Sequence, residues 1–251
     1  MMLEDLTLGE YYFEAANILR NSLLLSWYNV TKKEISNLES VDETLIRKIF
    51  SAHSKTPLEL LYLETGNIPI RFILKARRLG YLWYILHEDD DTLLQTVFKA
   101  QCNKPVAGDW VKTVQDDLKD IDLDMSFSEI MKQTKDSFKN LIKSKVKAAA
   151  FTYLRNIQAT KSKSKNIEYK CLELQNYLKP GNNMTLQEKC FAFQARSRYV
   201  PVKCNFKIGQ SDLKCRQCGV EDETQEHIMT CPALEDNTVA HNEINNPEYS
   251  A

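Results

Sequence analysis

Apolar residues between Ser126 and Thr160 recur at intervals of three and four positions, the spacing of one face of an α-helix. This pattern predicts one long helix over 126–160 with a buried face. The stretch from Tyr169 to Tyr177 has a second apolar repeat and predicts a further helix, which Pro180 and Gly181 end. The longer repeat comprises Phe138, Leu141, Ile142, Val146, Ala149, Tyr153 and Ile157.

Short polar motifs mark where other helices begin. In a capping box, a Ser or Thr side chain and an acid three residues later exchange hydrogen bonds with the free amides at the helix start. Pro57 also stands at a first helical position, where its missing N–H costs nothing. These signals, in a chain with only seven glycines, predict an all-α fold. The six capping pairs are Thr7/Glu10, Thr31/Glu34, Ser40/Glu43, Thr56/Glu59, Ser126/Glu129 and Thr185/Glu188.

The formal net charge of −1 conceals an uneven distribution of charge. Residues 132–170 contain eleven basic residues and two acids, a local balance of +9, whereas residues 221–251 contain eight acids and neither Lys nor Arg. Lys139, Lys143 and Lys147 repeat every four residues along the edge of the apolar stripe. Such a row suits phosphate groups, although the solvated side of an amphipathic helix has the same pattern. The KSKSK run that follows, with Lys161, Lys163 and Lys165, predicts an exposed basic loop.

Four residues near the C-terminus have the types and spacing of a metal site. Cys215 and Cys218 are separated by two residues, and His227 and Cys231 follow at an interval of about one helical turn. Gly219 can supply the positive φ of a tight knuckle between two thiolates. Zinc takes four such ligands, and a site filled by protein at all four positions is structural. The alternative is two reduced surface thiols beside a core His and Cys.

Cysteine usage and hydropathy bear on where the protein resides. Seven is an odd number of cysteines, and three of them lie within the last forty residues beside a histidine, which favours metal binding over disulfides. No run approaches the roughly 18 apolar residues of a membrane span, and the first ten residues lack the order of a signal peptide. We therefore expect an intracellular protein, nuclear or cytoplasmic, without a membrane partner.

Several stretches, in this order, resemble the region that follows the palm in reverse transcriptases of non-LTR retrotransposons, the LINE class. They are residues 38–86, 108–118, 191–206 and the terminal CRQCGVEDETQEHIMTC. The resemblance implies that the first block belongs to a thumb, a helical bundle that grips the primer–template duplex. It also implies that the terminal Cys-Cys-His-Cys knuckle contacts nucleic acid. The partners it implies are RNA or an RNA–DNA duplex, bound with low sequence specificity, and an intact polymerase.

The chain departs from this family in its catalytic residues. The paired aspartates with which such polymerases hold two metal ions are absent from the sequence. The acidic run from Glu88 to Asp91 lacks flanking strand residues, which indicates a solvated helix end. A glycine-rich phosphate loop and a nucleophile with a base partner at motif spacing are also missing. We expect no enzymatic activity, and a truncated copy, a gene-model fragment and a domesticated tail all remain open.

Arginines extend the set of candidate nucleic-acid contacts beyond the lysines. Arg77 and Arg78 follow an apolar helix face and would contact the duplex where the family's thumb meets it. Arg196 and Arg198 stand between Phe193 and Tyr199 and would either stack on unpaired bases or pack against the knuckle. The aromatic residues Phe191 and Phe193 are expected in the core.

Two functions of different classes follow. The first is a retrotransposon-derived nucleic-acid-binding fragment that grips RNA or RNA–DNA duplex through basic helices and one structural Zn²⁺. The alternative is a zinc-stabilised helical module that binds protein, or an expressed relic without function. The expected organisation is a thumb-like helical region (1–100), a connector (101–125), a basic helical region (126–200), a small zinc knuckle (201–234) and an acidic, disordered tail (235–251).

Overall fold

The computed structural model describes residues 31–104, 106, 108–162, 164–181, 183–205 and 212–234. The Thr7/Glu10 pair, Lys163 and the acidic tail over 235–251 lie outside the described residues. Within these residues the structure is all-α, as expected, and its β pairing is limited to two isolated bridges. The α-helices are α2 (Lys32–Ile49), α3 (Leu58–Thr65), α4 (Ile70–Leu86), α5 (Leu93–Asn103), α6 (Trp110–Asp120), α7 (Phe127–Met131), α8 (Lys135–Ala159), α9 (Leu186–Ser197) and α10 (Gln225–Thr230).

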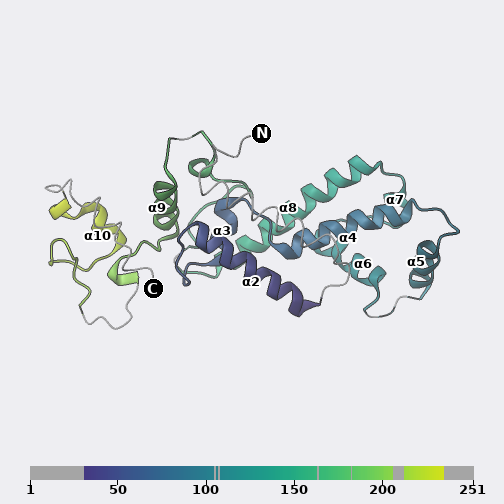
Figure 1. Ribbon diagram of the computed structural model, residues 1–251, viewed down its shortest axis with the longest axis horizontal. Helices are drawn as coiled ribbons and strands as arrows, with labels where there is room; N and C mark the ends of the chain where they lie inside the picture. Colours follow the sequence, from purple (N-terminus) through teal and green to yellow (C-terminus); the bar gives the residue numbers. More distant parts are fainter. Residues whose placement is uncertain are drawn as a thin grey trace, which may run out of the picture.

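Helix α4 lies at the centre of the bundle, because apolar side chains cover most of its circumference. It packs along α8 and also contacts α2, α5, α6 and α7 (Figure 1). The two long helices run antiparallel. The rings of Phe72 and Tyr153 lie 5.6 Å apart near one end, and Trp83 Nε1 donates a 3.0 Å hydrogen bond to the Gln133 carbonyl at the other. This pair of helices is the frame on which the shorter helices pack.

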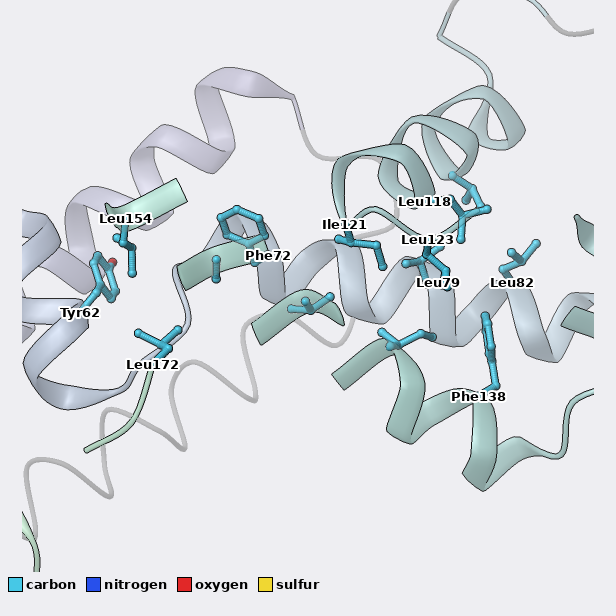
Figure 2. Packing of buried hydrophobic residues seen from close by; sticks show 14 of the residues in the cluster. Tyr62, Phe72, Leu79, Leu82, Leu118, Ile121, Leu123, Phe138, Leu154 and Leu172 are labelled. Atoms are coloured by element: carbon cyan, nitrogen blue, oxygen red, sulfur yellow. The ribbon is translucent and has the colours of Figure 1, made fainter. Parts of the chain in front are cut away.

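The core is continuous from α3 to the start of α8 (Figure 2). Leu82 and Phe138 pack between α4 and α8 toward α7, whereas Tyr62 and Leu154 pack between α3 and α8. Each of these four side chains is at most 2% exposed. Burying a side chain of this size stabilises the fold by about 1.5–3 kcal/mol. The apolar stripe of residues 138–157 was therefore correctly predicted to face a core.

Three of the predicted capping boxes are present. Thr31, Ser126 and Thr185 each accept a hydrogen bond from the backbone N–H of the glutamate three residues later. That glutamate side chain in turn accepts one from the N–H of the cap residue. The two bonds satisfy amides that have no partner inside the helix. Helices α2, α7 and α9 consequently begin where the sequence predicted.

Two other predicted boxes are wrong. Ser40 lies inside α2, where its carbonyl accepts a hydrogen bond from the Thr44 hydroxyl, so no helix begins there. Thr56 and Glu59 are both buried and give no side-chain cap to α3, which begins at Leu58 after Pro57. At Thr56 and Glu59, tertiary burial has taken the side chains away from the solvated helix end that a capping box occupies.

The single helix predicted over 126–160 is two helices, α7 and α8, separated by three residues. Thr134 begins α8 by accepting a hydrogen bond from the Ser137 backbone N–H. Side chains of α4 bind the carbonyls at the break: Trp83 Nε1 donates to Gln133, and the His87 ring lies 3.1 Å from the carbonyl oxygen of Met131. These tertiary bonds satisfy carbonyls that an uninterrupted helix would have used itself.

The helix predicted over 169–177 is also wrong. Leu174 forms an antiparallel bridge with Thr65, and only one short 3-10 turn follows. The cause is Gly66, which ends α3 with φ of +67° and against which the chain packs closely. A Cβ at this position would lie 2.5 Å from backbone atoms of Glu173 and Leu174. The close approach holds this segment as extended chain beside α3.

The cysteine-rich segment around α10 lies at one end of an elongated molecule, and α5 lies at the other (Figure 1). Gln225 Nε2 donates a 2.8 Å hydrogen bond to the Ala195 carbonyl, which joins α10 to α9. Among the helices described, none combines the length and the apolar character needed to cross a membrane.

Candidate metal centre and basic helix face

The first half of the cysteine-rich module is a tight backbone turn. Lys214 and Asp222 form an isolated antiparallel bridge, and the Cys215 N–H donates a 2.7 Å hydrogen bond to the Glu221 carbonyl. Gly219 has φ of +67°, and its N–H donates to the Cys215 carbonyl at 2.8 Å. This is the knuckle that the two-residue spacing predicted, with glycine at the position that requires the left-handed conformation.

The second half of the module is helix α10. Thr224 caps this helix by accepting a hydrogen bond from the His227 N–H, a cap that the sequence analysis missed. His227 lies in the first turn and Cys231 is the residue that ends the helix. Their side chains therefore project toward the knuckle from positions one turn apart.

The structure brings the four predicted ligands together. One donor atom from each of Cys215, Cys218, His227 and Cys231 lies within 4.8 Å of all the others. The sulfurs of Cys215 and Cys231 are 3.9 Å apart, and the Cys218 sulfur is 3.2 Å from His227 Nε2. A tetrahedral zinc with bonds of about 2.3 Å to sulfur separates two thiolates by about 3.8 Å. The cluster thus can hold a metal ion, and its dimensions and donor set are compatible with zinc.

Two thiols of the cluster, Cys218 and Cys231, have pKa values shifted in opposite directions. Backbone N–H groups of Glu221 and Val220 point at the Cys218 sulfur and lower its pKa to about 6, so this group is a thiolate at neutral pH. Burial raises the pKa of Cys231. Burial by itself would lower the pKa of His227, but its hydrogen bonds with the cysteine sulfurs outweigh that effect and raise it. One ligand is therefore already in its metal-binding form.

A carboxylate outside the cluster orients the histidine. Glu221 Oε2 lies 3.1 Å from His227 Nδ1, which leaves Nε2 facing the Cys218 sulfur. Carboxylates commonly hold metal-bound histidines in this way and fix the ring's tautomer. The sequence analysis missed Glu221, and the only signal was an acid inside the loop that follows the second cysteine.

An ion pair between Arg216 and the buried carboxylate of Glu223 joins the knuckle to the chain that follows α9. Glu223 is 2% exposed, and Arg216 donates to it from Nε and Nη2 at 2.8 and 2.7 Å. The backbone N–H of Lys203 also donates to this carboxylate. Burial would raise the pKa of Glu223, but these hydrogen bonds outweigh burial and lower it. The module is thereby fixed to residues 201–204, with Arg216 Nη2 also reaching the Pro201 carbonyl at 3.0 Å.

The lysines predicted on α8 lie on its outer side. Lys139 and Lys143 are exposed, whereas Lys147 is partly covered and pairs with Glu173 at 3.4 Å. Lys135, the first residue of the helix, continues the exposed row, and Lys132 is exposed in the turn before it. With neighbours four positions apart and a rise of 1.5 Å per residue, the row from Lys135 to Lys147 extends for about 18 Å. In the following loop, Lys161 and Lys165 are exposed, as predicted.

The two arginines predicted on α4 have different surroundings. Arg78 is buried, and its Nε and Nη2 donate to Asp117 of α6 at 2.6 and 3.0 Å. Lys75 lies 3.3 Å from the same carboxylate. Arg77 is half-buried. The buried guanidinium of Arg78 joins α4 to α6. We therefore leave Arg78 out of the proposed nucleic-acid contacts.

The remaining arginines lie at the end of α9. Arg198 is exposed and ends the helix in a left-handed conformation with φ of +60°. Arg196 pairs with Glu64 of α3, and its guanidinium lies about 6 Å from the ring centres of Tyr169 and Tyr177. Phe193 is fully buried, as expected. Phe191 is 46% exposed, so its predicted place in the core is wrong.

The acidic run from Glu88 to Asp91 follows the end of α4. Asp90 pairs with Lys99 at 2.7 Å, and the side chains of Asp89, Asp90 and Asp91 are exposed. The position is that of a solvated helix end, as predicted.

Comparisons with protein-family models, with curated proteins and with solved structures find no match to this chain.

Proposed function

We propose that this protein binds nucleic acid without catalysing a reaction, and that the lysine row of α8 contacts the phosphates. The observation that carries the proposal is the exposed row of Lys135, Lys139 and Lys143, on a helix whose opposite side is fixed in the core. Lys132 is exposed in the turn just before this helix. Each lysine that neutralises a phosphate releases condensed counterions, which gives affinity without sequence specificity. A rigid helix presents these charges at fixed intervals, so few conformations are lost on binding.

The metal cluster supports this function as a structural zinc site. Three thiolates and one imidazole would fill all four positions of a tetrahedral ion and leave no place for water or substrate. The ion would join the knuckle to α10 and so fix the end of the chain that follows α9. Zinc is favoured because sulfur-rich tetrahedral sets select it over magnesium, calcium and manganese.

The resemblance to the region after the palm of LINE-type reverse transcriptases points to the same function. Under this proposal, α2 to α8 correspond to a thumb-like bundle, and RNA or an RNA–DNA duplex is the ligand. The protein would act in the nucleus or cytoplasm, alone or beside an intact polymerase.

A salt-dependent titration tests the proposal. Fluorescence anisotropy with labelled single-stranded RNA and an RNA–DNA duplex should show an association constant that falls steeply with salt. The Lys139→Gln/Lys143→Gln variant should reduce the slope of log K against log salt by about 1.4 for a single strand, because each lost phosphate contact contributes about 0.7. Lys48→Gln/Lys119→Gln removes the same charge from exposed positions on α2 and α6 and is the control.

The control decides whether the lysine row acts as a site. If both double variants lower the slope equally, net charge alone governs binding and α8 is not the contact. If the wild-type protein binds neither ligand at low salt, the proposed function is wrong.

A second candidate function is protein binding by the cysteine-rich module. Its basic side chains Lys214 and Arg216 pair internally with Asp222 and Glu223, so the module offers little positive charge. Val220 and Met229 are 71% and 64% exposed on the same module. If a His227→Ala variant loses its metal but still binds RNA, this module is not part of the nucleic-acid contact.

A further inference from the structure

Glu64 is a buried carboxylate that binds three side chains from later in the sequence, those of Tyr169, Tyr177 and Arg196. It is 1% exposed and lies near the end of α3. The hydroxyl of Tyr177 donates to it at 2.8 Å and that of Tyr169 also donates to it. Arg196 Nε donates to both of its oxygens, at 2.9 and 3.2 Å. The Gln175 N–H donates to the Glu64 carbonyl at 3.0 Å, which holds the extended segment in place.

Arg196 is paired differently from the other arginines that bind carboxylates in the described chain. In those pairs, Nε and a terminal nitrogen both donate to the acid. Arg196 uses Nε alone, and its side chain is 40% exposed. Within the described residues, the hydrogen bonds of this guanidinium to a carboxylate come from Nε, and the Tyr169 side chain is its other hydrogen-bond partner. The other pairs are Arg47–Glu43, Arg71–Glu39, Arg78–Asp117 and Arg216–Glu223.

Two aromatic rings lie beside this guanidinium. The Arg196 Cζ lies 6.0 Å from the ring centre of Tyr169 and 5.9 Å from that of Tyr177. Both distances are at the limit of about 6 Å for cation–π attraction. The hydroxyls of the same two tyrosines donate to Glu64, so both tyrosines and Arg196 bind one carboxylate. An arginine held in this way loses little rotational freedom when its terminal nitrogens meet a ligand.

We propose that Arg196 is a pre-oriented contact for one phosphate group of the bound nucleic acid. This inference rests on the proposed function and names a second contact on it. Two terminal guanidinium nitrogens match the spacing of two phosphate oxygens, a geometry that lysine does not reproduce. The extended segment connects the two sites: Glu173 pairs with Lys147 of α8, and Gln175, two residues on, binds the backbone of Glu64. A chain of contacts thus joins Lys147 of α8 to Glu64, which binds Arg196.

The variants must separate binding from folding, because Arg196→Gln alone would leave the buried Glu64 without its cationic partner. Glu64→Gln/Arg196→Gln removes both charges and leaves no unpaired buried ion. Lys179→Gln is the control, since it removes one exposed positive charge close to Tyr177 from a residue that is not a candidate contact. Thermal unfolding should place the double variant within a few degrees of the wild-type protein.

Binding to a short single-stranded RNA decides the proposal. The double variant should bind several-fold more weakly at low salt, with its salt slope reduced by about 0.7, the contribution of one phosphate. Lys179→Gln should change neither value by as much. A wild-type slope in the double variant, or an equal loss in Lys179→Gln, would overturn the assignment of this phosphate to Arg196.

A second measurement keeps the inference separate from the proposed function. The Arg196 Nε–Hε resonance of the full chain should be observable, because Glu64 binds this proton. Titration with inorganic phosphate should shift it more than the corresponding resonance of Arg78, whose terminal nitrogen is already bonded. Absence of RNA binding with a phosphate-dependent shift at Arg196 would refute the function and retain the anion site. RNA binding without such a shift would refute the site alone.

Discussion

Glu221 Oε2 lies 3.1 Å from Nδ1 of His227, whose Nε2 lies 3.2 Å from the Cys218 sulfur. The carboxylate and the thiolate hold opposite nitrogens of one ring, so the orientation of the imidazole is set from both sides. In metal sites, outer partners of this kind contribute 10- to 100-fold to metal affinity.

The first prediction concerns this outer carboxylate. The protein should bind one Zn²⁺, and Glu221→Gln should weaken binding by about 10- to 100-fold, measured by competition with a chromophoric chelator. Glu226→Gln, an exposed acid on α10, should not. His227→Ala should lose the metal, whereas Cys171→Ser, at an exposed thiol outside the cluster, should keep it. A metal content unchanged by His227→Ala would show that these residues do not form the site.

Two glycines should respond to alanine in opposite directions. Gly66→Ala places a Cβ 2.5 Å from the Glu173 and Leu174 backbone in a left-handed conformation, and the conformation alone costs about 1–2 kcal/mol. Gly80 lies within α4, and the methyl group of an alanine there would meet no atom within 4 Å, so Gly80→Ala should stabilise by about 0.5–1 kcal/mol. Urea unfolding of both variants measures these changes. Equal destabilisation by the two substitutions would contradict the close approach at Gly66.

The buried pair of Arg78 and Asp117 should matter for folding and not for binding. Asp117→Ala leaves Arg78 buried without its carboxylate and should destabilise the protein by about 3–5 kcal/mol. Arg78→Met should cost less, because Lys75 still lies 3.3 Å from Asp117. Chemical unfolding gives both values, and anisotropy should find the RNA affinity of folded Arg78→Met unchanged. A selective loss of RNA affinity in this variant would restore Arg78 as a contact.

Glu59 should make stability depend on pH in the unusual direction for an acid. Burial raises its pKa, and the nearby positive charges of Lys161 and Arg47 offset only part of that effect. An acid whose pKa is raised in the folded state stabilises the fold when protonated, and this contribution is lost as pH rises through the folded pKa. Glu59→Gln should therefore raise the melting temperature at pH 7, and the gain should disappear below the ordinary value of 4.5.

Thermal unfolding at several pH values measures the effect of Glu59→Gln against the wild-type protein. Glu168→Gln, at an exposed acid, is the control and should show no such change with pH. A gain for Glu59→Gln that is the same at pH 4 and pH 7 would exclude titration of this carboxyl as its cause.

The cluster of candidate metal ligands could be predicted from the sequence because its geometry is local. Two residues between Cys215 and Cys218 allow a knuckle, and His227 and Cys231 are four positions apart, about one helical turn, so neither pair required knowledge of the bundle. The same holds for the caps at Thr31, Ser126 and Thr185, which depend only on residues three positions apart.

Predictions failed where distant residues decide the outcome. The break before α8 depends on Trp83 and His87, some fifty and forty-four residues away, which bind carbonyls of the connecting turn. The helix predicted over 169–177 is absent because Gly66 brings α3 against that chain. Periodicity within a segment carries no information about such partners. For the same reason, the sequence did not reveal that Asp117 pairs with Arg78 or that Glu64 pairs with Arg196.

The carboxylate of Glu64 also sets an order of events during synthesis. Its side-chain partners lie 105, 113 and 132 residues further along the chain, so a ribosome completes α2 to α8 before any of them emerges. Until then, the nascent bundle carries an uncompensated acid where α3 will later be covered. Contacts of such long sequence separation form late, because closing the intervening loop is slow. The contacts that join α3 to α9 can therefore form only after α9 has been translated.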